Sequence, residues 1–211
     1  MIFAICYSIM WLITFLFYPT KVIGKKNLPK KKGVILTCNH YSNWDAIMLD
    51  TKLHKKIRFL AKKELFEKKI SAFFMKKFGG ISIDRDKPGI ASFKQVVSVL
   101  HKNKIVGIFP EGTRNKDKSD NSLQTIHQGA ITFASKADVQ IVPAIIYRRF
   151  KVWRKNYIVI GQPLDIIGED PKRLTKEEIE KNLVRLTEAL NKLRNDMDQK
   201  IEDKKKHKKN R

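Results

Sequence analysis

Short apolar runs alternate along this chain with segments of helical periodicity, and this alternation limits the fold more than any other feature of the sequence. Short runs rich in aliphatic residues are typical of buried strands, whereas apolar residues three or four positions apart are typical of helices that cover a sheet. We therefore expect strands at residues 34–38, 57–60, 81–83, 105–109, 141–147 and 157–160. We expect helices at residues 90–101 and 126–137, and further helices at 45–53 and 70–78. This order predicts an α/β fold, a single domain with a largely parallel or mixed sheet flanked by helices.

The length of 211 residues is sufficient for one domain with a sizeable core and too short for two domains of ordinary size. We expect three parts: a hydrophobic membrane-anchoring segment at 1–19, the main folded domain at 20–203, and a disordered basic tail at 204–211. The last helix of the domain is the clearest element. Thr175 and Glu178 have the spacing of a capping box, and the apolar residues from Ile179 to Ile201 predict one buried stripe.

The first 18 residues carry no charged side chain. As a helix they would extend roughly 27 Å, close to the thickness of a bilayer's hydrocarbon core. Four of their aromatic residues recur every four positions and would form one stripe that either faces lipid or packs on the domain; they are Phe3, Tyr7, Trp11 and Phe15. We expect a membrane-associated helix that either crosses the bilayer or lies in its interface, with a soluble core helix as the alternative. Six lysines between Lys21 and Lys32 favour a cytoplasmic location for the rest of the protein.

The chain has 44 Lys and Arg residues against 21 Asp and Glu residues, a formal charge of +23. Lysines spread along a sequence most often form a solvated surface. The second interpretation of the positive charge is that it binds a membrane surface with anionic lipids. Each basic residue near such a surface contributes about 1 kcal/mol to the binding free energy. No nucleic-acid partner is expected, because no zinc-finger spacing, RNA-binding aromatic signature or helix-turn-helix pattern accompanies the charge.

The two cysteines, Cys6 and Cys38, lie in apolar stretches and have no CxxC spacing. Neither a disulfide scaffold nor a metal site is expected. Cys38 precedes His40 by two residues, so a Cys/His nucleophile pair is one interpretation. A small buried core residue is the preferred one.

His40 lies in the sequence NHYSNWD, directly after the strand expected at 34–38. A histidine with a carboxylate partner can act as a general base, and Asp45 follows five residues later. On a regular helix the two would be about 140° apart and would not meet. A turn in which Ser42 or Asn43 caps a helix would bring the Asp45 carboxylate back to one imidazole nitrogen and fix the tautomer. The alternative is a capping turn that contains an incidental histidine.

A second candidate site, the sequence PEGTR, follows the strand expected at 105–109. Arg114 offers a planar fork suited to phosphate, with the Thr113 hydroxyl and the Gly112 main-chain N–H as neutral donors. Glu111 would repel phosphate, so we expect it to orient Arg114 or to bind a hydroxyl. The alternative is a plain surface turn. If the strands are parallel, both loops emerge at one edge of the sheet, and the base and the phosphate-binding group would face one cleft.

Four motifs together resemble those of the glycerolipid acyltransferases. NHYSNWD is similar to their histidine-x4-aspartate motif, GGISIDR at 79–85 to their second motif, FPEGTR at 109–114 to their third and IVPAII at 141–146 to their fourth. The short length, the apolar N-terminus and FPEGTR are most similar to the 1-acylglycerol-3-phosphate O-acyltransferases, or lysophosphatidic acid acyltransferases. The resemblance implies that residues 20–203 form an acyltransferase domain.

The resemblance also implies roles for single residues. His40 would be the catalytic base and Asp45 its partner, and Arg114 with Glu111 would bind the acceptor. Arg85 would be a further acceptor contact, with an ion pair to a neighbouring aspartate as an equally plausible role.

By the same resemblance, the reaction would transfer an acyl group from acyl carrier protein or acyl-CoA to the 2-hydroxyl of a lysophospholipid acceptor, 1-acylglycerol-3-phosphate. It would give phosphatidic acid with no cofactor and no covalent acyl-enzyme, and the chain has no GxSxG nucleophile elbow. Other acceptors remain open: glycerol-3-phosphate, another lysophospholipid or a saccharide lipid. A hypothesis of a different class is a non-catalytic basic protein that binds membranes or nucleic acid.

One position departs from the family pattern. Members commonly have a lysine just before the Gly-Ala that opens the next helix, whereas this chain has His127, then Gln128, at that point. A histidine with ordinary surroundings is fully charged only below about pH 6.5. We therefore expect phosphate affinity to be weaker or to be supplied by other groups.

Overall fold

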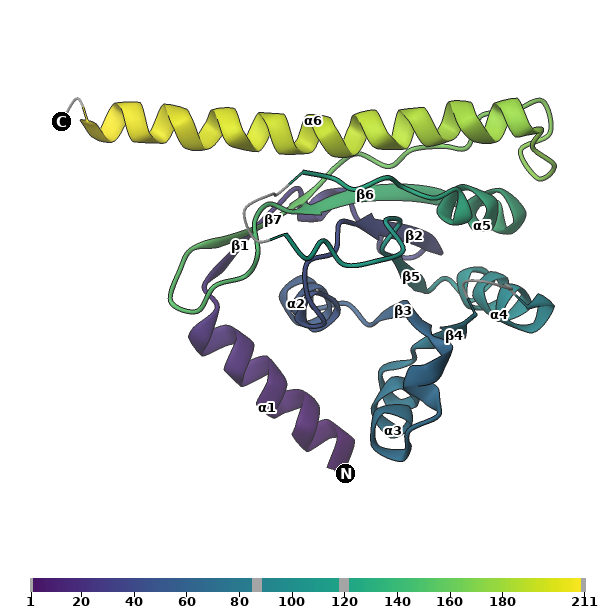
Figure 1. Ribbon diagram of the computed structural model, residues 1–211, viewed down its shortest axis with the longest axis horizontal. Helices are drawn as coiled ribbons and strands as arrows, with labels where there is room; N and C mark the ends of the chain where they lie inside the picture. The colour runs from purple at the N-terminus through teal and green to yellow at the C-terminus, as the bar shows by residue number, and fades with distance from the viewer. Residues whose placement is uncertain (1, 85–88, 118–121, 210–211) are drawn as a thin grey trace.

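The computed structural model describes residues 2–84, 89–117 and 122–209, and its centre is a seven-stranded sheet with strand order β1-β7-β6-β2-β5-β3-β4 (Figure 1). The strands are β1 Thr20–Ile23, β2 Val34–Cys38, β3 Ile57–Lys62, β4 Ile81–Ile83, β5 Ile105–Ile108, β6 Gln140–Ile146 and β7 Asn156–Ile160. The helices are α1 Ile2–Phe17, α2 Trp44–Leu53, α3 Lys69–Phe78, α4 Ile90–His101, α5 Gly129–Ala137 and α6 Lys176–Lys209. Two short 3-10 helices, η1 Lys25–Asn27 and η2 Lys63–Phe66, complete the set.

The sheet is mixed, and this confirms the predicted α/β class. β2 pairs in parallel with both β5 and β6, and β3 pairs in parallel with β5 and β4. β7 runs antiparallel to β6, while β1 runs parallel to β7. The strand β1 was not predicted, because it is short, lies at the edge of the sheet and contains the exposed Lys21.

The strand directions place several segments at one edge of the sheet, which we call the carboxyl edge. Strands β2, β5 and β6 end there, at Cys38, Ile108 and Ile146. Because β1 and β7 run the other way, they begin at this edge. The end of α1 and the loop between β6 and β7 therefore lie at the edge where the two candidate motifs emerge.

Helices cover both faces of the sheet. On one face Leu36 of β2 packs in a cluster with Leu49 of α2. On the other face Ile35 packs with residues of α4, α5 and α6, including Leu100 and Leu190. Ile35 and Leu36 pack on opposite faces because successive side chains in a strand point in opposite directions. Figure 1 shows α6 along one side of the sheet and α2 on the other, with α1 outside α2.

Helix α1 is attached to α2 by polar contacts. The Thr14 hydroxyl is buried and donates to the Thr51 hydroxyl at 3.2 Å, and the Lys52 ammonium donates to the Thr14 carbonyl at 2.7 Å. The opposite side of α1 remains exposed, with Phe15 60% exposed. Among the helices that the structure describes, none is both long enough and apolar enough to span a bilayer.

Helix α6 begins at the predicted capping box. The Thr175 main-chain N–H donates to the Glu178 carboxylate at 2.7 Å, and the Glu178 N–H donates to the Thr175 hydroxyl at 3.2 Å. The helix continues to Lys209, so the described part of the expected disordered tail is helical. Lysine is a good helix former, and its charge is favourable beside the negative C-terminal end of a helix.

Candidate active site

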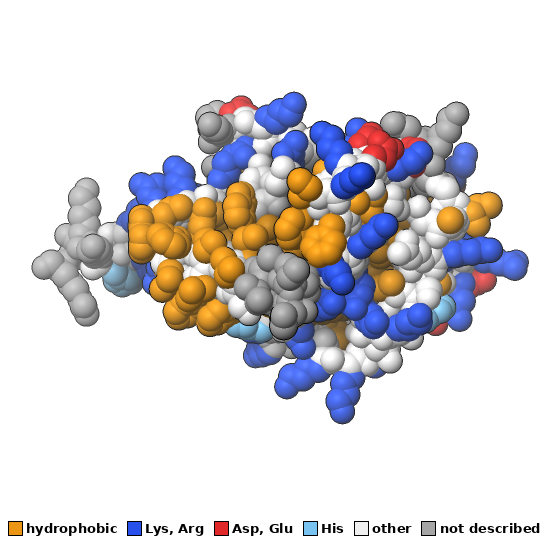
Figure 2. All heavy atoms as spheres, turned by 90° about the horizontal axis from the view of Figure 1, so that it is seen from below, with side chains coloured by type: hydrophobic (Ala, Val, Ile, Leu, Met, Phe, Trp, Pro, Cys, Tyr) orange, Lys and Arg blue, Asp and Glu red, His pale blue; other side chains and the backbone are white. Residues whose placement is uncertain are grey.

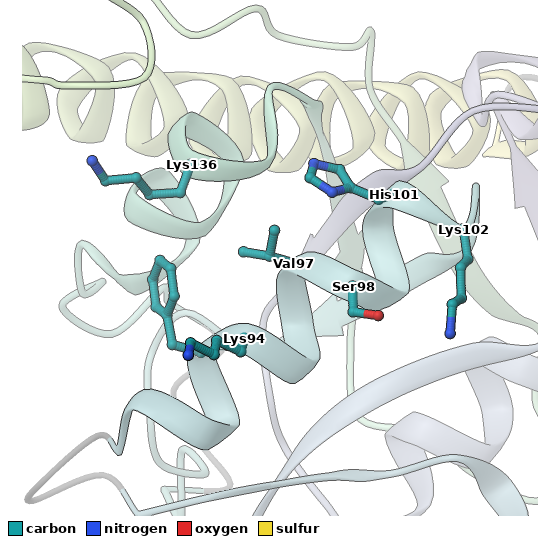
Figure 3. A pocket seen from close by; sticks show the side chains of 7 residues that line it. Lys94, Val97, Ser98, His101, Lys102 and Lys136 are labelled. Atoms are coloured by element: carbon teal, nitrogen blue, oxygen red, sulfur yellow. The ribbon is translucent and has the colours of Figure 1, made fainter.

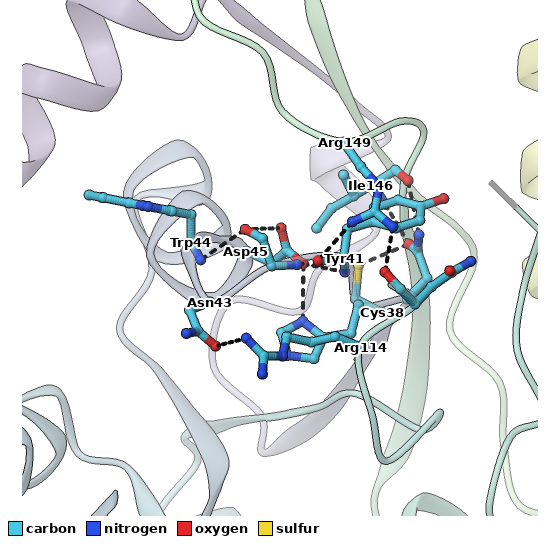
Figure 4. A network of polar contacts seen from close by, with 12 residues as sticks. Cys38, Tyr41, Asn43, Trp44, Asp45, Arg114, Ile146 and Arg149 are labelled. Carbon is cyan, nitrogen blue, oxygen red and sulfur yellow. Dashed lines mark hydrogen bonds and ion pairs between the residues drawn. The ribbon is translucent and has the colours of Figure 1, made fainter. Parts of the chain in front are cut away.

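The turn after β2 brings His40 and Asp45 together. The Ser42 hydroxyl accepts a hydrogen bond from the Trp44 N–H at 3.1 Å, whereas Asn43 at the N-cap makes no side-chain capping bond. Asp45 lies in the first turn of α2, with its Oδ2 atom 3.0 Å from His40 Nδ1 (Figure 4). The predicted turn and the predicted His–Asp contact are both present.

The Asp45 carboxylate is held by the main chain as well as by the imidazole. Its Oδ2 atom also accepts hydrogen bonds from the N–H groups of Tyr41 at 2.6 Å and Ser42 at 2.7 Å, and the residue is 1% exposed. An oxygen that accepts from His40 requires the proton to be on Nδ1. Nε2 is therefore the nitrogen with a free lone pair, which is the arrangement required of a general base.

An aromatic stack fixes the plane of the imidazole. The His40 ring lies 3.9 Å from the Phe109 ring at an interplanar angle of 12°, and Phe109 stacks on Phe59 at 5.2 Å. Gly107 pairs with Phe59 across β3 and β5. A Cβ atom at Gly107 would overlap the Phe59 ring and lie 2.8 Å from the Ile57 side chain, so the stack depends on this glycine.

The loop after β5 forms a tight turn rather than an open N–H donor site. Gly112 has φ +66°, and its N–H donates to the Phe109 carbonyl at 3.0 Å, so the expected main-chain donor is used within the turn. A Cβ atom at Gly112 would approach the imidazole of His127 to 3.1 Å. The His127 N–H donates to the Pro110 carbonyl at 2.8 Å, which places the residue beside this turn with an exposed side chain.

Arg114 connects the two motifs. Its side chain is exposed, and Nη1 donates to the Asn43 amide oxygen at 3.0 Å. Thr113 is also exposed, and its hydroxyl donates to the Arg114 carbonyl at 3.3 Å. The prediction that both loops meet at one edge of the sheet is thus confirmed. Arg85 lies outside the described residues.

Glu111 does not orient Arg114 as expected, because it points into the protein. It is 3% exposed, and neither carboxylate oxygen makes a hydrogen bond within the part of the chain that the structure describes. Burial raises its pKa from 4.5 to about 7, although the nearby main-chain N–H groups of His40 and Gln124 and the charge of Arg194 act in the opposite direction. The composition of the motif gave no indication of which side chains face inward.

Comparison with known proteins identifies the family to which these motifs belong. A family model described as Acyltransferase matches residues 19–147. The chain belongs to this acyltransferase family. It is 35% identical over 190 residues to the 1-acyl-sn-glycerol-3-phosphate acyltransferase of Bacillus subtilis, covering 86% of this chain and 89% of that protein. It is 29% identical over 147 residues to the human 1-acyl-sn-glycerol-3-phosphate acyltransferase alpha, covering 67% of this chain and 51% of that one.

The fold of this acyltransferase also matches a solved structure. The crystal structure of the 1-acyl-sn-glycerophosphate (LPA) acyltransferase PlsC from Thermotoga maritima aligns with a TM-score of 0.65 at 22% identity. The alignment covers 90% of this chain and 80% of that one. The predicted resemblance to the glycerolipid acyltransferases is confirmed by these relatives.

Cys38 does not form a Cys/His nucleophile pair with His40. It is 1% exposed, and its thiol donates to the Asn39 amide oxygen at 3.6 Å. Burial, followed by the charge of Asp45, raises the pKa of the thiol well above its usual range. A thiol kept protonated in the core cannot serve as the attacking group, and the interpretation as a core residue is confirmed.

A groove that the structure describes lies away from the motifs. A groove of about 490 Å³ between α4 and α5 is lined by Lys94, His101, Lys102 and Lys136 around Phe93 and Val97 (Figure 3). Helix α4 runs back from the carboxyl edge, so His101 and Lys102 at its end lie near the amino ends of the strands. None of the motif residues lines this groove. Within the described residues, no group of three or more His, Cys, Asp or Glu is arranged to bind a metal.

Three polar residues that hold the acyltransferase site were not predicted. The Asn39 side chain joins the ends of β2 and β6, accepting from the Ile146 N–H at 2.8 Å and donating to its carbonyl at 3.1 Å. The Asn115 N–H donates to the His40 carbonyl at 2.8 Å. Arg149 donates to main-chain carbonyls of both loops. Asn39 and Asn115 lie next to motif residues, so the sequence could have indicated them. No feature of the sequence indicates Arg149.

Proposed function

We propose that this acyltransferase transfers a fatty acyl group from an acyl thioester, acyl carrier protein or acyl-CoA, to the 2-hydroxyl of 1-acylglycerol-3-phosphate and gives phosphatidic acid. The proposal depends above all on the 3.0 Å contact between His40 Nδ1 and a buried Asp45 that also accepts two main-chain N–H groups. The acceptor is inferred from the activity by which the relatives are named, 1-acyl-sn-glycerol-3-phosphate acyltransferase.

In the proposed reaction His40 Nε2 takes the proton of the acceptor hydroxyl as its oxygen attacks the thioester carbonyl carbon. The carbon–sulfur bond then breaks, and the imidazolium returns the proton to the leaving sulfur, so the products are the ester and a free thiol. Asp45 stabilises the imidazolium that forms between these steps. The stack with Phe109 keeps the ring plane fixed, which reduces the entropic cost of reaching the transition state.

The phosphate of the acceptor is assigned to Arg114. Its guanidinium is exposed. It lies beside the turn that contains His40, since it donates a hydrogen bond to Asn43 in that turn. A guanidinium binds phosphate through paired, charge-assisted hydrogen bonds. The exposed Thr113 hydroxyl and the His127 imidazole, which packs by Gly112, are the neighbouring polar groups. Glu111 is assigned no contact with the acceptor because it is buried.

The surroundings of the carboxyl edge support binding to a membrane surface. Exposed apolar residues occur on α1, on η2 and α3, at the start of α2 and in the β6–β7 loop; among them are Ile9, Trp11, Leu12, Phe15, Leu16, Phe17, Trp44, Leu65, Ile70, Phe73, Val152 and Trp153. Figure 2 shows hydrophobic side chains gathered over α1 with Lys and Arg side chains around them. Such a surface favours an interface with anionic lipids, where a lysophospholipid acceptor is found.

Vesicle binding tests this part of the proposal. Phe15→Glu or Trp153→Glu should weaken co-sedimentation with vesicles of anionic phospholipid at least tenfold, because each removes about 1.5–3 kcal/mol of apolar burial. Ile167→Glu is the matched control, since Ile167 is 42% exposed and follows the segment that bridges to Ile141 at the opposite edge. Equal binding by all three variants and the unchanged protein would rule out this surface as the membrane contact.

A panel of acceptors tests the reaction itself. The protein is incubated with one labelled acyl donor at a time, acyl carrier protein or acyl-CoA, and with 1-acylglycerol-3-phosphate, glycerol-3-phosphate, another lysophospholipid or a saccharide lipid. The proposal predicts labelled phosphatidic acid as the main product. Preferential labelling of another acceptor would move the assignment to that acceptor, and no release of thiol with any pair would remove the catalytic proposal.

A further inference from the structure

Arg149 lies in the loop after β6 and reaches both loops of the site (Figure 4). Its Nη1 atom donates to the Tyr41 carbonyl at 2.9 Å. Its Nη2 atom donates to the Asp117 carbonyl at 2.7 Å and also to the Asn115 carbonyl. The guanidinium carbon lies 4.9 Å from the centre of the Tyr41 ring, a cation–π contact. One side chain thus holds the His40 loop and the segment after Arg114 together.

The contact with Tyr41 acts on the peptide group that binds Asp45. The Tyr41 carbonyl and the Ser42 N–H belong to one planar peptide unit and point in opposite directions. The carbonyl accepts from Arg149, while the N–H donates to Asp45 Oδ2 at 2.7 Å. Fixing the carbonyl therefore aims the N–H at the carboxylate that orients His40.

The contact with Asn115 completes a closed ring of hydrogen bonds. The Asn115 N–H donates to the His40 carbonyl at 2.8 Å, and the Asn115 carbonyl accepts from Arg149. His40 is thus held from its side chain through Asp45 and from its main chain through Asn115. Both sets of contacts include a hydrogen bond from the Arg149 guanidinium.

We propose that Arg149 is a positioning residue for the acyl-transfer reaction, one that sets the His40–Asp45 geometry by joining the two loops through their main-chain carbonyls. The proposal rests on the proposed role of His40 as the base. The planar fork is required, because only a guanidinium presents several N–H donors in fixed directions. A lysine at this position has a compact ammonium group that cannot reproduce the fork.

Kinetics of matched variants test the proposal. Arg149→Lys should keep the charge but lower kcat roughly tenfold to hundredfold, the loss expected from misplacing a reacting group by about 1 Å. Arg149→Gln should lower kcat at least as much. The KM of the acyl donor should change less than about threefold, because Arg149 acts on the geometry of the base. Arg148→Lys and Arg148→Gln are the controls, since the exposed Arg148 donates to the Tyr147 hydroxyl at 3.3 Å instead.

Amide hydrogen exchange separates positioning from a general loss of stability. In Arg149→Lys, exchange should accelerate in residues 40–45 and 109–117 and stay unchanged in β6 at the centre of the sheet. A kcat equal to that of Arg148→Lys, or exchange that accelerates equally in β6, would overturn the proposal. Because exchange requires no turnover, this arm gives its result even if the proposed role of His40 fails.

Discussion

The buried Glu111 carboxyl should make the stability of the protein depend on pH in a way that one substitution removes. In the unfolded chain this group ionises near pH 4.5, whereas burial raises its pKa to about 7 in the folded protein. Between these values the unfolded state loses the proton and the folded state keeps it. The folded state therefore loses stability as the pH rises from 4.5 to about 7 and loses little more above that.

The magnitude follows from the displacement of the pKa. A change from 4.5 to about 7 corresponds to about 3 kcal/mol at roughly 1.4 kcal/mol per pH unit. Glu111→Gln has no such titration, so the free energy of unfolding of Glu111→Gln minus that of the unchanged protein should grow by about 3 kcal/mol between pH 4.5 and pH 8. Other groups titrate alike in both proteins and cancel in this difference.

Urea unfolding followed by circular dichroism at several pH values measures this difference. Glu188→Gln on the exposed face of α6 is the control, and its difference from the unchanged protein should vary by less than about 0.5 kcal/mol over the same range. A Glu111→Gln difference that stays constant from pH 4.5 to pH 8 would refute the reasoning. It would mean that the buried carboxyl ionises as easily as an exposed one.

Three further substitutions test the parts of the site. Phe109→Leu removes the ring that stacks 3.9 Å from His40 and should lower kcat about tenfold with little change in KM, as steady-state kinetics would show; an unchanged kcat would contradict the role of the stack. Arg114→Ala should raise the KM of the phosphorylated acceptor roughly tenfold to hundredfold, the equivalent of a charge-assisted hydrogen bond, while the KM of the acyl donor stays constant. Gly107→Ala should lower the free energy of unfolding by about 1–3 kcal/mol in urea, because its Cβ atom would overlap Phe59, and full stability would show that the ring moves freely.

Much of the fold could be predicted because burial imposes a pattern on the sequence. β2 and α4 occupy the expected residues, and the capping box at Thr175 and Glu178 is formed. β1 could not be predicted, since an edge strand with a lysine among four residues has no apolar run. The helical end of α6 was also missed, because a run of lysines has the same composition in a disordered tail and in an exposed helix.

The sequence could predict the part of the candidate site that is formed by side chains within the motifs. The His40–Asp45 contact and the meeting of the two loops follow from a turn and from parallel strands. The inward direction of the Glu111 side chain does not follow from these features. A turn at Gly112 is compatible with a Glu111 side chain that points into the protein and with one that points to solvent. Arg149 acts on main-chain carbonyls, which every residue has, so nothing in the sequence distinguishes it from Arg148.

The proposed reaction depends most on His40 as the base, and the turnover of His40→Ala tests this role directly. Transfer of labelled acyl groups to 1-acylglycerol-3-phosphate is measured beside His101→Ala, a control at the far groove. We expect His40→Ala to lose about 100-fold to 10,000-fold in kcat, the usual contribution of general base catalysis, and to bind vesicles as before. His101→Ala should keep full turnover. Turnover by His40→Ala at the level of His101→Ala would contradict the central claim.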